Sequence, residues 1–391
     1  MVFCRLQLIL LTALIGGYMS NLKTPFRYDF VGSFLRPEKL KKARRQFDEG
    51  SIDYAALKKV EDEAVTELVA KTKELGYHVI TDGEFRRATW HLDFMWGFEG
   101  IGHAPTKTGL PFHGEAAMID DTYIVGKIGL SKEHPFVDHF RFVKALEDEN
   151  TVAKQTMPAP AQFLAQFVMP FNRPATDEVY SSEEELVDDI VAAYGKVIDD
   201  LYAAGCRNIQ LDDCTWGMFA DKIGHTLYGT TKEGIIDFQK SHKDINNRVI
   251  ANAPSDMIIN THVCRGNFHS TYASEGAYDS VADILFGEEN VNAYFLEFDD
   301  ERSGGFAPLA KVSGDKKVVL GLITTKSPLL ENKELVINRI KEASKYIPLD
   351  RLYLSPQCGF ASCEIGNKLT EEEQWDKLRL VKEIAEEVWG C

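Results

Sequence analysis

Two residues of metal-binding type stand close together after an apolar run in the second half of the chain. His262 and Cys264 are two positions apart, so in a β-strand both side chains point to the same side. Histidine nitrogen and cysteine sulfur are favoured zinc ligands. By itself this spacing is more typical of a buried cysteine beside a hydrogen-bonded histidine, so the zinc hypothesis needs further ligands.

Two later apolar runs each end in a residue that could complete such a site. Glu297 is an acid within Tyr294–Asp299, where an ionised carboxylate is costly unless it is paired or bound to a metal. Cys358 follows Leu354–Gln357 on a predicted turn. The alternatives are a salt bridge at the edge of the core for Glu297 and a small buried hydrophobe for Cys358.

Short β-rich runs alternate with long amphipathic patterns, which is typical of βα units and a parallel sheet. The predicted strands are Phe30–Ser33, His78–Asp82, Thr151–Met157, Asn208–Asp212, Met257–Cys264, Ala293–Phe298, Lys317–Thr324 and Arg351–Leu354. The predicted helices are Glu38–Gln46, Tyr54–Leu75, Ser182–Ala204, Lys232–Asn247, Glu331–Tyr346 and Thr370–Val388, the last with the spacing of a capping box.

About eight parallel strands predict a (β/α)₈ TIM barrel of the α/β class, with an insertion after the second strand from Asp93 to Asp148. The carboxyl ends of barrel strands converge on one mouth. His262, Cys264, Glu297 and Cys358 would therefore meet there and hold one Zn²⁺. A doubly wound open sheet is the alternative, but no glycine-rich phosphate loop supports its nucleotide-binding form.

Composition and charge exclude several classes of protein. With 391 residues, of which 44% are apolar, the chain can build a core without disulfides. Its seven cysteines are odd in number and irregularly spaced, which is typical of a reducing compartment. The 44 basic against 60 acidic residues give a net charge of −16, which argues against nucleic acid as a partner.

The amino terminus contains a signal-like stretch. Arg5 precedes the apolar run Leu6–Tyr18, which is too short for a stable membrane span. No clear cleavage site follows, and Met19 stands before a polar segment. We therefore expect residues 1–24 to be a leader or upstream extension, residues 25–391 to be a single catalytic domain, and the protein to be cytoplasmic. A secreted zinc-binding protein is the non-enzyme alternative.

Ordered motifs between Tyr28 and Trp389 resemble the catalytic barrel of cobalamin-independent methionine synthase, particularly its short single-barrel relatives. The motifs are Val31–Phe34, Asp82–Glu84, Ile209–Asp212, Thr261–Cys264 and Ser355–Gly359. The resemblance implies zinc held by the same four residues and homocysteine bound to zinc through its sulfur. The methyl donor would be 5-methyltetrahydrofolate or its polyglutamate, and the enzyme an S-methyltransferase that makes methionine.

The resemblance also assigns residues to the amino acid part of homocysteine. It implies that Glu84 and Asp212 bind the ammonium group and that Ser33 binds the carboxylate. From the residues alone, Glu84 and Asp212 stand at strand ends and can reach the mouth. The alternative is that these acids form a network with Arg86 and Arg87 that shapes the rim.

Two departures from the family pattern concern the methyl donor. The family's proposed proton-donor histidine is replaced by Lys326, which could protonate a leaving nitrogen only if burial lowered its pKa toward neutrality. The family's folate-stacking tryptophan falls near Gln166, although Trp90, Trp96 or Trp216 could substitute. A methylated corrinoid protein is therefore an alternative donor, and another thiol is an alternative acceptor.

Overall fold

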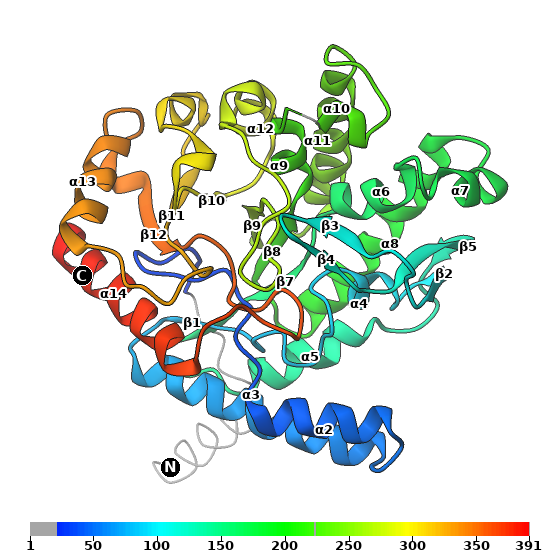
Figure 1. Cartoon of the computed structure of the whole chain (residues 1–391), viewed down its shortest axis with the longest axis horizontal. Coiled ribbons are helices and arrows are strands. Elements are labelled where there is room, and N and C mark those ends of the chain that lie inside the picture. The colour runs from blue at the N-terminus through cyan, green and yellow to red at the C-terminus, as the bar shows by residue number, and fades with distance from the viewer. Residues whose placement is uncertain (1–21, 223, 391) are drawn as a thin grey trace, which may run out of the picture.

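The computed structural model describes residues 22–222 and 224–390, and the signal-like stretch and Met19 lie outside them. Helices form an outer ring around an inner set of strands (Figure 1). The strands are β1 (Val79–Ile80), β2 (Glu99–Ala104), β3 (Leu110–Phe112), β4 (Glu115–Ala117), β5 (Asp121–Gly129), β6 (Val152–Ala153), β7 (Gln155–Pro158), β8 (Asn208–Asp213), β9 (Ile258–Val263), β10 (Ala293–Glu297), β11 (Lys317–Ile323) and β12 (Leu352–Pro356).

The helices are α2 (Glu38–Asp48), α3 (Tyr54–Glu74), α4 (Leu92–Met95), α5 (Pro135–Lys144), α6 (Pro160–Val168), α7 (Arg173–Val179), α8 (Glu183–Ala203), α9 (Thr215–Ala220), α10 (Gly224–Leu227), α11 (Ile235–Asn252), α12 (Ala282–Glu288), α13 (Lys333–Ala343) and α14 (Glu371–Trp389). Four 3₁₀ turns are η1 (Tyr278–Ser280), η2 (Glu301–Ser303), η3 (Ala307–Lys311) and η4 (Leu349–Arg351).

The inner strands run parallel and follow one another around the ring. Strands β7 to β12 pair in chain order, and β1 pairs with β6, which leads directly into β7. The amino-terminal segment closes the ring, because Tyr28 bridges Leu354 of β12 and the Phe34 N–H donates to the Gly83 carbonyl after β1 at 3.1 Å. The predicted parallel sheet is confirmed, and all eight predicted strand positions lie in this ring. The prediction of a strand at Phe30–Ser33 is wrong. This segment pairs with its neighbours only through the Tyr28–Leu354 bridge and single backbone hydrogen bonds, which are too few for a strand ladder.

The segment from Asp93 to Asp148 carries its own small structure between β1 and β6. Strands β2 and β5 pair antiparallel, β3 and β4 form a hairpin, and α4 and α5 flank them. In Figure 1 the β3–β4 hairpin lies on the inner side of α6 and α7. The sequence predicted no elements here, and the status of the segment as an insertion stays a prediction.

The helix boundaries follow local capping. The capping box of Thr370 and Glu373 at the start of α14 is confirmed. Helix α13 begins at Lys333 rather than at the predicted Glu331, because Asn332 caps it. The Glu331 carboxylate instead accepts hydrogen bonds from the Thr324 N–H and the Lys377 ammonium group.

Strands β8 to β12 are buried along almost their whole length, because helices cover their outer face and side chains fill the barrel. Alternate residues point to opposite faces of a strand. Phe295 and Val319 accordingly pack with Val31 and Tyr353 in a small inner cluster, while Leu296 and neighbouring leucines face the helices. Of the four residues of this inner cluster, Val31 also lines the cavity described below.

One buried ion pair ties three strand positions together inside the barrel. The fully buried Lys154 ammonium group lies 3.1 Å from an Asp29 oxygen and donates to the Phe30 carbonyl at 2.5 Å and to Gln210 Oε1 at 3.0 Å. Burial lowers the pKa of Lys154, and Asp29 opposes this shift. The pair joins β8 to the amino-terminal segment.

Replacing Lys154 by Met should lower the free energy of unfolding by about 3–5 kcal/mol, because it leaves the Asp29 carboxylate buried without its cation. Urea unfolding measures this change. The matched control is Lys39→Met, whose partner Glu67 is 67% exposed, and this variant should lose less than about 1 kcal/mol. Equal losses in the two variants would contradict the role of the buried pair.

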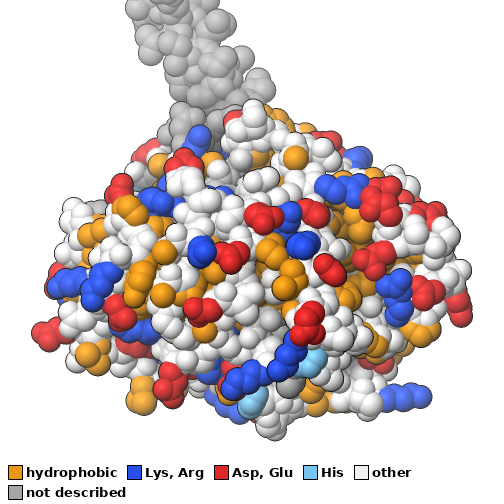
Figure 2. All heavy atoms as spheres, turned by 90° about the horizontal axis from the view of Figure 1, so that it is seen from above, with side chains coloured by type: hydrophobic (Ala, Val, Ile, Leu, Met, Phe, Trp, Pro, Cys, Tyr) orange, Lys and Arg blue, Asp and Glu red, His pale blue; other side chains and the backbone are white. Residues whose placement is uncertain are grey.

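Acidic and basic side chains are interspersed on the face shown in Figure 2, with scattered hydrophobic side chains between them. Within the described ranges, no helix is both long enough and apolar enough to cross a membrane.

Candidate metal centre and substrate cavity

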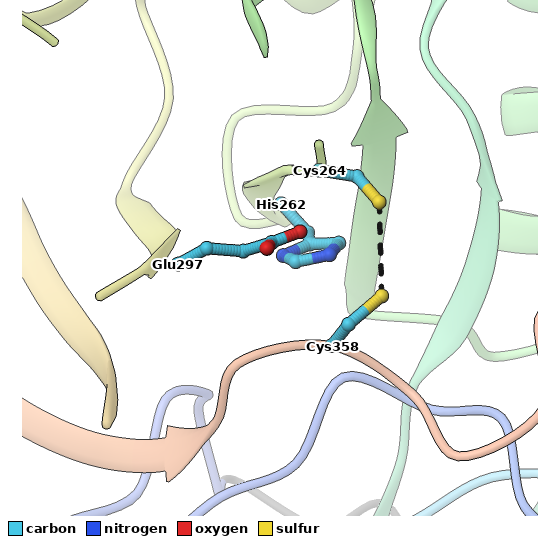
Figure 3. Close-up of side chains that lie close together, drawn as sticks. All are labelled: His262, Cys264, Glu297 and Cys358. Atoms are coloured by element: carbon cyan, nitrogen blue, oxygen red, sulfur yellow. Dashed lines mark hydrogen bonds between the residues drawn. The ribbon is translucent and has the colours of Figure 1, made fainter. Parts of the chain in front are cut away.

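The four predicted metal ligands lie together at the carboxyl ends of strands β9, β10 and β12. His262 is in β9 with Cys264 just beyond its end, Glu297 ends β10, and Cys358 follows β12. One potential ligand atom from each of the four buried residues lies within 4.8 Å of the other three. Figure 3 shows the four side chains converging from separate segments of the chain.

The distances within this cluster suit a tetrahedral zinc ion. The sulfurs of Cys264 and Cys358 are 3.7 Å apart. Two sulfurs that each bind zinc at about 2.3 Å with tetrahedral angles are about 3.8 Å apart. The sulfurs are far outside the distance of a disulfide, and both cysteines are free.

Hydrogen bonds orient the other two ligands and leave an atom free on each. His262 Nδ1 lies 3.2 Å from the Phe295 carbonyl. Because a carbonyl only accepts, Nδ1 carries the proton, and Nε2 keeps its lone pair. Glu297 Oε1 accepts the Arg265 N–H at 2.8 Å. His262 Nε2 and Glu297 Oε2 are buried without a hydrogen-bond partner among the described residues, as expected of metal ligands.

The two cysteines of the cluster hold their protons more tightly than free cysteines do. The pKa of the Cys264 thiol is well above its ordinary value because of Cys214 and burial, and Glu297 raises it further. The pKa of Cys358 is likewise well raised by Cys264 and burial. Coordination to a metal deprotonates a thiol outright. A divalent ion with two thiolates and one carboxylate would give a centre of net charge −1.

The turn that carries Cys358 is fitted tightly against the amino-terminal segment. A Cβ atom on Gly359 would lie 1.9 Å from Ser33 Oγ, so no larger residue fits there. The Phe360 N–H donates to the Ser33 carbonyl at 2.9 Å. Ser33 is thereby fixed beside the turn that carries Cys358.

A cavity of about 400 Å³ opens over the cluster. It is lined by three of the predicted ligands, His262, Cys264 and Cys358, and Glu297 lies behind them. The other lining residues are Val31, Ser33, Glu84, Trp90, His91, Leu110, Pro111, Phe112, His113, Ala117, Ile119, Gln162, Gln166, Met169, Phe171, Asp212, Cys214, Met218, Leu227, Arg265, Gly266, Asn267, Ala273, Ser274, Gly359, Ser362 and Cys363. The predicted acceptor residues and the thiol cluster therefore share one cavity.

Two buried acids line this cavity. Glu84 Oε1 lies 3.2 Å from Arg87 Nη1 and accepts the Thr156 hydroxyl at 3.0 Å, and Oε2 has no hydrogen-bond partner among the described residues. The backbone of Glu84 has a φ of 60°, a strained conformation for a residue other than glycine. Asp212 Oδ1 accepts from Gln210 Nε2 at 2.8 Å. Burial raises the pKa of each acid to about 7, and Arg87 opposes both shifts.

The alternative network around the arginines is also present. Arg87 contacts Glu84, whereas Arg86 lies 3.1 Å from Glu61 and also pairs with Asp62. Arg86 thus joins the turn after β1 to helix α3, and Arg87 holds one of the cavity acids. The two arginines could be predicted as partners of the acids because they follow Glu84 closely in the sequence. The sequence could not show that each arginine pairs with different acids.

The chain is similar to proteins of a known family. The family model described as "Cobalamin-independent synthase, Catalytic domain" matches residues 171–387. The uncharacterized protein YxjG of Bacillus subtilis is 42% identical over 373 residues, covering 94% of this chain and 96% of its own. The chain belongs to the cobalamin-independent methionine synthase catalytic-domain family.

Two further relatives are named as methionine synthases. A solved structure from Listeria monocytogenes, named as a candidate vitamin-B12-independent methionine synthase, is 36% identical with a TM-score of 0.74, and the match covers 95% of this chain and 100% of that one. The methionine synthase of Saccharolobus solfataricus is 25% identical over 336 residues, covering 84% of this chain and 86% of its own.

One residue expected to differ from the family pattern lies in the cavity. Gln166, the position expected to correspond to the family's tryptophan, lines the cavity and donates to the Thr122 carbonyl at 3.2 Å. Trp90 also lines it, whereas Trp96 stacks on His103 and Trp216 is fully buried in the core. Trp90 is therefore the best placed of the three tryptophans to face a planar donor.

The β3–β4 hairpin forms an apolar wall of the cavity that the sequence did not predict. Phe112 packs against Phe268 with ring centroids 5.4 Å apart. Glu115 lies 2.8 Å from His269 and 2.9 Å from Lys368, which ties the hairpin to loops after β9 and β12. The nearest sequence signal was the richness of this segment in glycine, histidine and aromatic residues.

Lys326 lies on the other side of Glu297, with its ammonium group 3.9 Å from Glu297 Oε2. It is absent from the residues that line the cavity within the described chain. Burial lowers the pKa of Lys326, but Glu297 and Asp299 outweigh burial and raise it. The lowered pKa that a proton-donor role requires is not found in the metal-free protein, and that role stays a prediction.

The cluster predicts one zinc ion per chain. Cys264→Ser and Cys358→Ser should each lose most of their zinc on dialysis against a weak chelator, because one of the two thiolates is missing. Metal analysis measures the content. Cys206→Ala is the control, since Cys206 is buried at the opposite end of β8 and should retain its zinc. Full zinc content in the Cys264→Ser/Cys358→Ser double variant would contradict the site.

The raised pKa of Asp212 predicts a pH dependence of stability. Between pH 4 and 7 the unfolded chain ionises this acid from its ordinary pKa of 3.8, while the folded chain holds the proton up to about 7. The folded state then binds more protons, so this group makes stability fall as pH rises through the window. Asp212→Asn should flatten that fall, measured by urea unfolding of metal-free protein at pH 5 and 7.5. An unchanged slope would show that the carboxyl is ionised in the folded state.

Proposed function

We propose that this protein is a zinc-dependent S-methyltransferase that transfers a methyl group from 5-methyltetrahydrofolate, or its polyglutamate, to homocysteine to form methionine. The observation that carries the proposal is that three members of the buried cluster, His262, Cys264 and Cys358, line the same cavity as a pair of buried acids. One end of the cavity suits a thiol, and the neighbouring acids suit an ammonium group.

The chain's own residues would hold and orient the acceptor. A zinc ion held by the four ligands supplies a Lewis-acid position at which a thiol binds as the thiolate at neutral pH. Glu84 and Asp212, whose pKa values are both about 7, become ionised when an ammonium group lies between them. Ser33 Oγ would donate to the substrate carboxylate. Such fixed contacts convert binding energy into orientation of the sulfur.

The acid pair also argues against other acceptors. A thiol without an amino group would leave two buried acids that can remain protonated, so it would gain nothing from them. A second thiol substrate therefore remains the less favoured alternative. We propose in addition that Asp93 to Asp148 is an insertion into the barrel whose β3–β4 hairpin adapts the donor side of the cavity.

A methylated corrinoid is the second candidate for the donor, and Gln166 is the observation that favours it. An amide provides a weaker stacking surface for a pterin than an indole does. A corrinoid carried by a partner protein would present its methyl group from outside the mouth and would need no pterin platform. Turnover with free methyltetrahydrofolate would then be slow.

The test is a matrix of acceptors and donors with zinc-loaded protein. Homocysteine, cysteine and mercaptoethanol are each combined with methyltetrahydrofolate, its triglutamate or methylcobalamin, and mass spectrometry detects the methylated product. We expect methionine from homocysteine. Asp212→Asn should weaken homocysteine binding by about 1.5–3 kcal/mol, one charge-assisted hydrogen bond, and keep its zinc. Methylation of mercaptoethanol as efficient as that of homocysteine would overturn the assigned acceptor.

A further inference from the structure

The inference concerns Lys326 and rests on the proposed function. We propose that Lys326 is a positioning residue that takes over the Glu297 carboxylate when a substrate thiolate binds the metal. Glu297 would then be a ligand with two alternative partners, the metal on one side and the Lys326 ammonium group on the other.

The two oxygens of Glu297 are in different situations. Oε1 is fixed by the Arg265 N–H at 2.8 Å. Oε2 has no hydrogen bond and lies 3.9 Å from Lys326 Nζ. A charge-assisted N–H···O bond is about 2.7–2.9 Å long, so a movement of about 1 Å would form one. Oε1 can serve as the pivot for this movement.

Lys326 is free to accept that oxygen. Its side chain is only 10% exposed, and Nζ has no hydrogen-bond partner among the described residues. The nearby acid Asp299 already has a cation, since Arg302 lies 3.5 Å from it. The Arg265 guanidinium group lies 4.4 Å from the centre of the Tyr278 ring rather than against Glu297. Lys326 is therefore the cation best placed for Glu297.

The charges explain why a second partner is needed. A divalent ion with two thiolates and Glu297 carries a net charge of −1, and a substrate thiolate would make it −2. Replacement of the Glu297 oxygen by the substrate sulfur would restore −1, and the thiol proton would leave through the cavity to solvent. The released carboxylate stays buried, where an unpaired charge costs several kcal/mol. The Lys326 ammonium group supplies its counter-ion.

This role differs from proton donation and predicts a different set of effects. The ammonium group competes with the metal for Oε2, so it weakens the bond from Glu297 to the metal and eases its release. Removing the charge should therefore leave zinc bound at least as tightly and weaken thiol binding. A residue that merely supports the fold would loosen zinc and destabilise the protein.

The experiment compares Lys326→Met with the charge-retaining Lys326→Arg in the zinc-loaded full chain. Zinc affinity is measured by chelator competition, homocysteine affinity by calorimetry, and the ligands of zinc by X-ray absorption. In the wild type, homocysteine should add one sulfur and remove one oxygen ligand. Lys326→Met should bind homocysteine about 10- to 150-fold more weakly, the loss of one charge-assisted hydrogen bond, and should retain the oxygen ligand. Lys326→Arg should restore most of the affinity.

Wild-type protein that binds no zinc, or binds homocysteine without a new zinc–sulfur bond, would overturn the proposed function and this inference with it. Wild-type exchange of oxygen for sulfur that is unchanged in Lys326→Met would overturn the inference alone. If Lys326→Met does not fold, Lys326→Gln takes its place, since it keeps a polar side chain and lacks the charge. Weaker zinc binding in the folded variants would assign Lys326 a structural role and overturn the inference.

Discussion

Two thiols and a carboxyl group buried within 4.8 Å of one another cannot all be ionised unless a cation stands among them. This constraint explains how the residues at the mouth of the barrel are arranged. It requires strand ends that hold the ligands rigidly, a histidine whose proton is fixed on Nδ1 by the Phe295 carbonyl, and a carboxylate anchored by the Arg265 N–H. The parallel ladder meets the requirement, because β9 and β10 pair residue by residue up to the cluster.

The acceptor side follows from the same ladder. Asp212 pairs in register with His262, so the acid and the ligand stand level on adjacent strands. Glu84 reaches the cavity from the far side through a strained turn that Arg87 and Thr156 hold in place. Glu84 thus has a strained backbone, and both acids are buried away from water. A positively charged substrate group would stabilise their ionised forms, and such an arrangement is typical of a binding site.

The part of the cavity that is proposed to face the methyl donor is built differently. It is lined by the β3–β4 hairpin, Trp90 and Gln166, none of which belongs to the parallel ladder. Loops and hairpins at the mouth of a barrel can change without disturbing the strands beneath them. Lys326 is absent from the residues that line the cavity in the described chain, and its ammonium group lies 3.9 Å from Glu297 Oε2.

The sequence by itself predicted the parallel strands, most of the long helices and the four residues of the cluster. These features depend on local runs of apolar residues and on residue types that bind metals, and both can be recognised in the sequence. It also placed Glu84 and Asp212 at strand ends. It could not predict the elements between Asp93 and Asp148, whose short strands pair through long-range contacts. It could not show that Trp90 rather than Trp96 or Trp216 lines the cavity. Nor could it orient Lys326, because the neighbours of a side chain, and hence its pKa, are set only when Glu297 and Asp299 are packed against it.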